Sequence, residues 1–390
     1  MELDDLLTEL HKRNGSDLYL TAESPPLFRV DGATVALGER ALDGDEVAKI
    51  IRAALPAVDM AEFDRAHELN TARFVAGAGR FRLNVFRQRG QVGMVARLIR
   101  IDFPSASELG LPDALQRLIL EKRGLILVTG STGSGKSTTL AALIDHRNKL
   151  TRGHILTIED PIEFVHPHKG CVITQREIGV DTDSFGAALK SALRQAPDVI
   201  LIGEMRDLET VSAAIHFAET GHLVLGTLHA NNANQSIERV MNFFPHEAHE
   251  QLYAQLALNL RGVVSQRLVP VADGKGRVGA IEIMLNTPRI ADLIAKGEIE
   301  ALKGAIEQNV LDGSQSFDQA LYGLYRSGKI GLEEALRQAD SANNLRLKIK
   351  MEDAGAAGAA AADAMGAAIP GPSAAPPAFT LKPKEDPWAA

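Results

Sequence analysis

The chain has 390 residues, of which 45% are hydrophobic, so it is long enough for two folded domains and apolar enough to give each a core. A formal net charge of −8 argues against a general nucleic-acid-binding surface. Cys171 is the only cysteine, which excludes an internal disulfide and a zinc knuckle and is typical of a reducing compartment.

The first hundred residues combine helical and strand-like patterns. Helical apolar spacing covers residues 2–12 and 45–54, and two-residue alternation predicts half-buried strands over 16–21 and 81–86. The acidic start of the chain, residues 1–5, is unlike a signal peptide, and no apolar run approaches the roughly 18 residues of a membrane span. We therefore expect a cytoplasmic protein.

A linker is predicted at residues 103–105 and a helix over 113–121. From there to about residue 271 strands and helices alternate, which predicts a mostly parallel sheet with helices on both faces. Residues 288–350 are predicted to be helical, and residues 354–390, rich in Ala, Gly and Pro and containing Trp388, to be disordered. The predicted organisation is an N-terminal domain over 1–102, a linker over 103–112, a second domain with C-terminal helices over 113–350, and a tail over 351–390.

The strongest motif is a phosphate loop at residues 130–137, which fits G-x-x-x-x-G-K-[ST]. A predicted strand over 125–129 precedes it and a predicted helix over 137–150 follows, and this arrangement binds a triphosphate at the helix N-terminus. Lys136 is expected to reach the β- and γ-phosphates, and Ser137 to bind Mg²⁺. The predicted nucleotide-binding residues are Gly130, Ser131, Thr132, Gly133, Ser134, Gly135, Lys136, Ser137 and Thr138.

Polar residues follow three further apolar runs, at residues 154–158, 199–202 and 223–227. Ligands of open parallel sheets bind beyond the carboxyl ends of the strands, so these polar residues are candidates for the site. Phosphoryl transfer to water needs Mg²⁺ on the phosphates and a group that orients the water. We predict that Glu204 holds the metal or its water shell, that Glu163 polarises the water and that His229 contacts the γ-phosphate.

These motifs resemble the Walker A, Asp box, Walker B and His box of secretion and pilus ATPases. In that order they lie at residues 130–137, 157–164, 193–207 and 220–230. Because four motifs recur in order, the chain is similar to the type IV pilus retraction ATPases, the PilT/PilU family, over about residues 3–350. Segments that resemble the PilU branch are residues 230–235, 265–270 and 339–347. The PilT signature Ala-Ile-Arg-Asn-Leu-Ile is here Arg-Ile-Ala-Asp-Leu-Ile, at residues 289–294, which again favours PilU.

The resemblance implies a RecA-like P-loop ATPase domain with a smaller N-terminal α+β domain of the PAS-like kind and with C-terminal helices. It implies that ATP and Mg²⁺ bind, that Glu163 is the water-orienting base and that Glu204 supports the metal. It also assigns His222, together with His229, to the His box.

The resemblance further implies a homohexameric motor for pilus retraction and twitching motility. Arg82 and Arg97 match family arginines that reach nucleotide phosphates across a domain or subunit boundary, a task that suits the permanent charge and bidentate fork of arginine. The expected partners are an inner-membrane pilus platform protein and a PilT-like paralogue. The expected location is peripheral, on the cytoplasmic face of the inner membrane.

Three other functions stay open at this point. An assembly or secretion ATPase of the same superfamily commonly carries a four-cysteine zinc module, which one cysteine cannot build. A nucleotide-binding subunit that hydrolyses poorly and modulates a partner motor would carry the same motifs. A nucleic-acid translocase is disfavoured by the acidic charge and by the lack of a basic and aromatic run, so no nucleic acid is expected as a partner.

Overall fold

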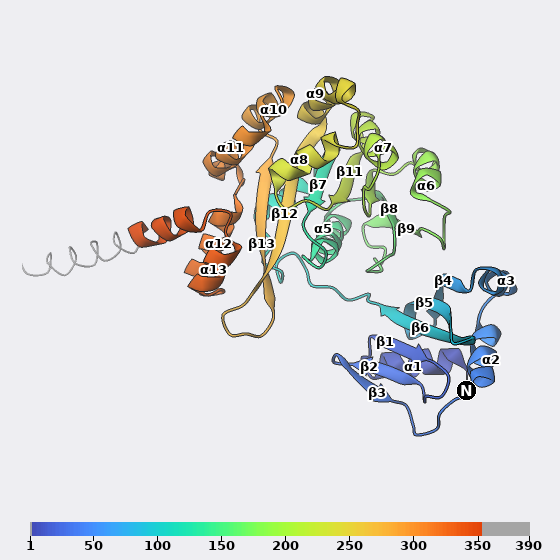
Figure 1. Cartoon of the computed structure of the whole chain (residues 1–390). Helices are drawn as coiled ribbons and strands as arrows, with labels where there is room; N and C mark the ends of the chain where they lie inside the picture. The colour runs from blue at the N-terminus through green and yellow to red at the C-terminus, as the bar shows by residue number, and fades with distance from the viewer. Residues whose placement is uncertain (1, 353–390) are drawn as a thin grey trace, which may run out of the picture. The chain divides into compact units, whose positions relative to one another are not determined.

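The computed structural model describes residues 2–352, so the predicted disordered tail at 354–390, with Trp388, lies outside the described residues. The described residues fall into two units, one that ends at Asp340 and one that begins at Ser341. In the second unit the described residues form a helix over 342–352. Figure 1 labels the helices and strands described below, all of which belong to the first unit.

A six-stranded antiparallel sheet comes first in the chain, in the order β3-β2-β1-β6-β5-β4. Its strands are β1 (Asp17–Leu20), β2 (Leu27–Val30), β3 (Ala33–Ala36), β4 (Glu68–Val75), β5 (Gly79–Gln88) and β6 (Gln91–Ile99), with helices α1 (Leu3–Lys12), α2 (Gly44–Ala54) and α3 (Ala57–Ala66). Burial alternates along β5, where Phe81, Leu83 and Val85 point into the core. The leucines of α1 pack into the same core, as its helical spacing predicts.

Helix α3 was not predicted from the sequence. It turns only Met60 and Phe63 into the core, so it carries little of the apolar periodicity that reveals a helix. Its N-cap is Pro56, and it ends at His67, which has a left-handed φ of 64°. The left-handed residue His67, rather than an apolar stripe, marks the end of this helix.

A seven-stranded sheet follows, in the order β13-β12-β7-β11-β10-β8-β9. Its strands are β7 (Gly124–Thr129), β8 (Gly153–Glu159), β9 (Cys171–Glu177), β10 (Val199–Ile202), β11 (Leu223–Leu228), β12 (Leu260–Pro270) and β13 (Arg277–Leu285). Every neighbouring pair is parallel except β12 and β13, which form an antiparallel hairpin. The predicted mostly parallel sheet is therefore confirmed, with β7 near its centre.

Helices cover both faces of this sheet. Leu125 and Leu127 of β7 face a core shared with α6 (Phe185–Ala192), α7 (Leu208–Glu219), α8 (Ala233–Met241), α9 (His249–Asn259), α10 (Pro288–Ala295) and α11 (Leu302–Gln308). The alternate residues Ile126 and Val128 face a second core shared with α4 (Asp113–Leu118) and α5 (Lys136–Leu150). This alternation follows from the two-residue period of a strand. Helix α12 (Phe317–Arg326) contacts β13, and α13 (Leu332–Gln338) contacts α12.

The predicted helix over 113–121 is shorter in the structure, because α4 ends at Leu118. Arg147 of α5 explains the early end, since its Nη1 donates hydrogen bonds to the carbonyl oxygens of Ile119 (2.7 Å) and Glu121 (2.8 Å). These carbonyls follow the helix and need partners outside it. Among the residues that the structure describes, no helix is both long and apolar enough to cross a membrane.

Candidate functional site

The phosphate loop joins β7 to the N-terminus of α5. Three of its glycines have positive φ: Gly130 (149°), Gly133 (75°) and Gly135 (90°). A Cβ on Gly130 would lie 2.5 Å from the carbonyl oxygen of Gln266, and one on Gly135 would lie 2.8 Å from the Gln266 amide nitrogen. The loop therefore needs glycine for both conformation and space.

Two buried hydrogen bonds tie the loop's flanks to β12. The Thr129 hydroxyl, just before the loop, donates to the Ser265 hydroxyl (3.0 Å). The Thr139 hydroxyl, in the first turn of α5, donates to the side-chain oxygen of Gln266 (2.8 Å). Buried polar groups are costly when unpaired, so these bonds fix the strand–loop–helix segment against its neighbour.

Lys136 lies over the loop. Its Nζ donates to the carbonyl oxygens of Gly130 (2.8 Å) and Ser131 (3.0 Å). Burial lowers the pKa of the Lys136 ammonium, and the nearby Glu204 carboxylate partly opposes that shift. A half-buried cation at a helix N-terminus, beside a glycine-rich loop, suits a phosphate chain.

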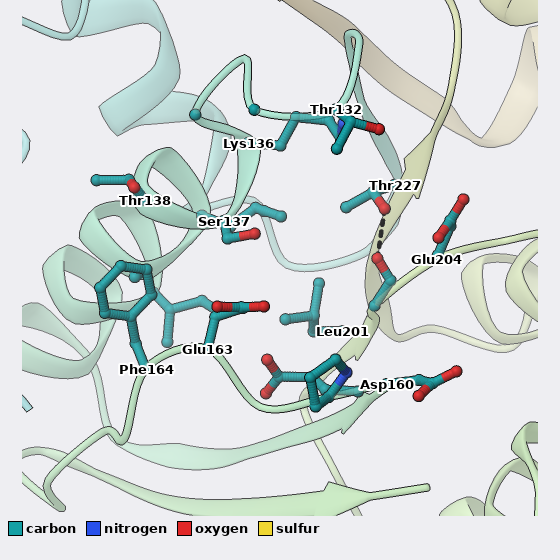
Figure 2. Close-up of a pocket in the computed structure, with 18 of the residues that line it drawn as sticks. Thr132, Lys136, Ser137, Thr138, Asp160, Glu163, Phe164, Leu201, Glu204 and Thr227 are labelled. Atoms are coloured by element: carbon teal, nitrogen blue, oxygen red, sulfur yellow. Dashed lines mark hydrogen bonds between the residues drawn. The ribbon is translucent and has the colours of Figure 1, made fainter. Parts of the chain in front are cut away.

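A cavity of about 640 Å³ opens over the loop, and it brings most of the predicted residues together. Figure 2 shows Lys136 and Ser137 from the loop and helix, with Glu163 and Glu204 around the same space. The predicted site residues that line the cavity are Thr132, Gly133, Gly135, Lys136, Ser137, Thr138, Glu163, Glu204 and His229. Gly130, Ser131 and Ser134 do not line it, and the Ser134 side chain is buried.

Glu204 has a partner at each of its carboxylate oxygens. Its Oε1 lies 2.9 Å from Nε2 of His229, and its Oε2 lies 2.6 Å from the guanidinium of Arg206. The Arg206 guanidinium also lies 3.7 Å from Asp160. These contacts join the ends of β8, β10 and β11 into one charged cluster.

The residues of the cavity fit a magnesium ion that is bound mainly by the phosphates of a nucleotide. No cluster of three or more His, Cys, Asp or Glu side chains suited to a metal occurs in the described residues, so the protein alone offers no cage. Mg²⁺ is usually held by one or two protein oxygens together with phosphates and water. The Ser137 hydroxyl and the Glu204 carboxylate in one cavity supply that kind of donor set.

Three other predicted residues lie outside the cavity. His222 stands before β11, at the strand end opposite to His229, and its Nδ1 lies 3.1 Å from the carbonyl oxygen of Phe217. Arg82 and Arg97 are cross-strand neighbours on β5 and β6. Arg97 Nε donates to Asp17 Oδ1 (2.7 Å), so that guanidinium has a carboxylate partner within its own sheet.

Glu159 is a cavity residue that received no role from the sequence. Burial raises the pKa of Glu159 to about 7, and hydrogen bonds from Thr157 (2.6 Å) and from the Gln175 amide (3.2 Å) only partly oppose this. Its place directly after an apolar run was a visible signal. Its raised pKa was not, because the burial that causes it arises only when distant segments of the chain pack together.

A phosphate loop on a central parallel strand, with carboxylates at the ends of neighbouring strands, defines a P-loop ATPase. The model of the family described as Type II/IV secretion system protein matches residues 96–305. The type IV pilus ATPase PilU of Pseudomonas aeruginosa is 51% identical over 351 residues, which cover 90% of this chain and 92% of that protein. The type IV pilus retraction ATPase PilT of the same organism is 43% identical over 344 residues, covering 88% of this chain and all of that protein.

A crystal structure of the pilus retraction motor PilT with bound ADP superposes with a TM-score of 0.81 and 41% identity, covering 87% of this chain and 98% of that one. The chain therefore belongs to the Type II/IV secretion system protein family and, within it, to the type IV pilus ATPases of the PilT/PilU kind. The family resemblance and the fold class predicted from the motifs are both confirmed.

The Glu159 carboxyl should make stability depend on pH. Its pKa is about 7 in the fold against 4.5 for the ordinary group, so its stabilising contribution is complete below pH 4.5 and is lost as pH rises through 7. Glu159→Gln should therefore gain stability relative to wild type between pH 5 and pH 8, by roughly 3 kcal/mol at most. Urea unfolding at both pH values measures this difference.

The exposed Glu300→Gln is the matched control and should show no such pH-dependent difference. A Glu159→Gln variant whose stability tracks wild type across this pH range would contradict a raised pKa for Glu159.

Proposed function

We propose that this chain hydrolyses ATP to power type IV pilus retraction and twitching motility, in the manner of a PilU-like motor. One observation carries the hydrolytic part: Lys136, Ser137, Glu163 and Glu204 line one cavity above the phosphate loop. The relatedness to PilU and PilT over most of the chain supports the pilus part.

In this proposal the loop amides and Lys136 bind the β- and γ-phosphates. Ser137 and, through water, Glu204 would hold a Mg²⁺ ion, which would supply positive charge against the phosphates. Glu163 orients the attacking water and accepts its proton, because a carboxylate facing the γ-phosphate side of the cavity can act as a general base.

His229 contacts the γ-phosphate and, through its 2.9 Å contact with Glu204, links the metal-supporting carboxylate to the chain that enters α8. A change at the γ-phosphate then moves a segment outside the phosphate loop. Such a link is what a motor needs, because the loss of a phosphate must alter a contact elsewhere.

We propose a ring of six subunits, in which Arg82 and Arg97 serve a nucleotide across a domain or subunit boundary. The domain division that goes with this is 1–102, a linker over 103–112, and an ATPase domain with C-terminal helices over 113–350. The ring would act at the cytoplasmic face of the inner membrane, on the pilus platform protein and together with a PilT-like paralogue. The mass of the purified particle tests this: any stable assembly other than six subunits would contradict it.

Lys136→Ala should abolish ATP hydrolysis, because it removes the cation over the phosphates and no core atoms. Glu204→Ala and Glu163→Gln should each lower kcat by about 100-fold or more while ATP still binds, since they act on metal and water. Phosphate release and equilibrium nucleotide binding measure the two effects.

Circular dichroism provides the folding control for these variants. A folded Lys136→Ala protein that hydrolyses ATP at the wild-type rate would rule out this site. A Glu163→Gln or Glu204→Ala protein that keeps more than about a tenth of the activity would remove that residue from its proposed role.

In cells, replacing the gene with one encoding Lys136→Ala should impair pilus retraction, most visibly under load, while surface pili are still made. Microscopy of labelled pili together with twitching assays measures both. A strain without surface pili would point instead to an assembly ATPase.

A further inference from the structure

The cavity has a cation that the mechanism above does not use. Among the described residues, its lysine and arginine lining consists of Lys136, Arg206 and Arg277. Lys136 lies on the loop carbonyls, and Arg206 is paired with Glu204 and Asp160. The Arg277 side chain is exposed, and neither a hydrogen bond nor an ion pair joins its guanidinium to the described part of the chain. Its positive charge therefore has no carboxylate partner among the described residues, and it lines the cavity over the phosphate loop.

The hairpin of β12 and β13 holds Arg277 in place. Arg277 is the first residue of β13 and pairs with Pro270 at the end of β12. The turn is closed by a hydrogen bond from the Val271 amide to the Gly276 carbonyl (3.3 Å). The Ala272 amide also donates to the carbonyl oxygen of Lys329 (2.9 Å), which anchors the turn to the rest of the unit. The backbone of Arg277 is therefore held in the hairpin and does not belong to a free loop.

Strand alternation points Arg277 toward the phosphate loop. Ile281 and Ile283 of β13 belong to the core on the α5 face of the sheet. Gly279 and Arg277 continue the same two-residue row. Gly279 pairs with Leu268, whose side chain would lie 3.6 Å from a Cβ on Gly135. This row of alternate residues thus runs from Ile281 in the core, past Gly279, to Arg277 beside the phosphate loop.

The order of the strands determines which end of the nucleotide Arg277 would meet. Glu163, Glu204 and His229 follow β8, β10 and β11, which lie on one side of β7. Strands β12 and β13, with Arg277, lie on the other side. A nucleotide whose γ-phosphate faces the carboxylates presents its α-phosphate and nucleoside toward β12 and β13.

We infer that Arg277 binds the α-phosphate at the nucleoside end of the nucleotide. Guanidinium is suited to this because it is always charged and can donate two parallel hydrogen bonds to one phosphate. The α-phosphate is common to ATP and ADP and does not react, so Arg277 contributes to affinity for both nucleotides more than to turnover. This inference rests on the proposed function, since it assumes that ATP occupies the cavity.

Arg277→Ala should weaken the binding of both ADP and ATP by roughly tenfold, as expected for the loss of a charge-assisted hydrogen bond. The KM for ATP should rise far more than kcat falls. Arg277→Lys should recover part of the affinity, because the charge is kept and the fork is lost. Titration calorimetry with ADP and with an ATP analogue that is not hydrolysed, followed by steady-state kinetics, measures these changes.

Lys275→Ala is the matched control, because Lys275 carries the same charge on the same hairpin and does not line the cavity. It should bind both nucleotides like wild type. An Arg277→Ala protein with unchanged ADP affinity, or with lowered kcat at unchanged KM, would overturn the inference while leaving ATP hydrolysis by this chain intact. Wild-type protein that binds no ATP would instead overturn the proposed function itself.

Discussion

The site depends on how β7, the phosphate loop and α5 are held against β12. Thr129 before the loop bonds Ser265, and Thr139 after it bonds Gln266. Between these bonds the glycines approach Gln266 so closely that a Cβ on Gly130 would collide with backbone. A phosphate cradle is useful only when its amides stay in place, because rigid, prearranged donors bind charge without reorganisation. Strand β12 provides that rigidity through its contacts with the two flanks of the loop.

The reactive side of the cavity is built differently, from charges at neighbouring strand ends. Parallel strands end at the same edge of a sheet, so Glu204 after β10 lies beside His229 after β11 and near Asp160 after β8. Glu204 is not isolated, since both of its oxygens have cationic or imidazole partners. We expect the arrival or departure of a negatively charged phosphate to alter the ion pairs of this cluster. The two halves of the site thus combine a fixed cradle with an electrostatically sensitive wall.

Much of this arrangement could be predicted from local patterns. The phosphate loop, the apolar strands and the polar residues after them are each contained in one short segment, and the parallel order of strands gathers them at one edge. Other features arise only from distant segments. The raised pKa of Glu159 depends on its burial by the packed fold, and Arg277 reaches the cavity through a hairpin that local patterns did not link to the loop.

The arginines also show that local sequence patterns do not determine contacts between distant segments. Family resemblance suggested Arg82 and Arg97, yet Arg97 is paired with Asp17 within its own sheet, and neither lines the cavity. Residues whose proposed partner belongs to another domain or subunit cannot be placed by motif spacing alone. Helix α3 was missed for a simpler reason, because two buried side chains leave almost no periodic signal.

The most direct test of the account is a structure of the protein with Mg²⁺ and an ATP analogue that is not hydrolysed. The account predicts the analogue over the phosphate loop, with its γ-phosphate toward Glu163 and Glu204. It also predicts that Lys136 Nζ leaves the carbonyl oxygens of Gly130 and Ser131 and contacts the phosphates instead. An analogue bound elsewhere, or bound in this cavity with Lys136 still on the loop carbonyls, would contradict it.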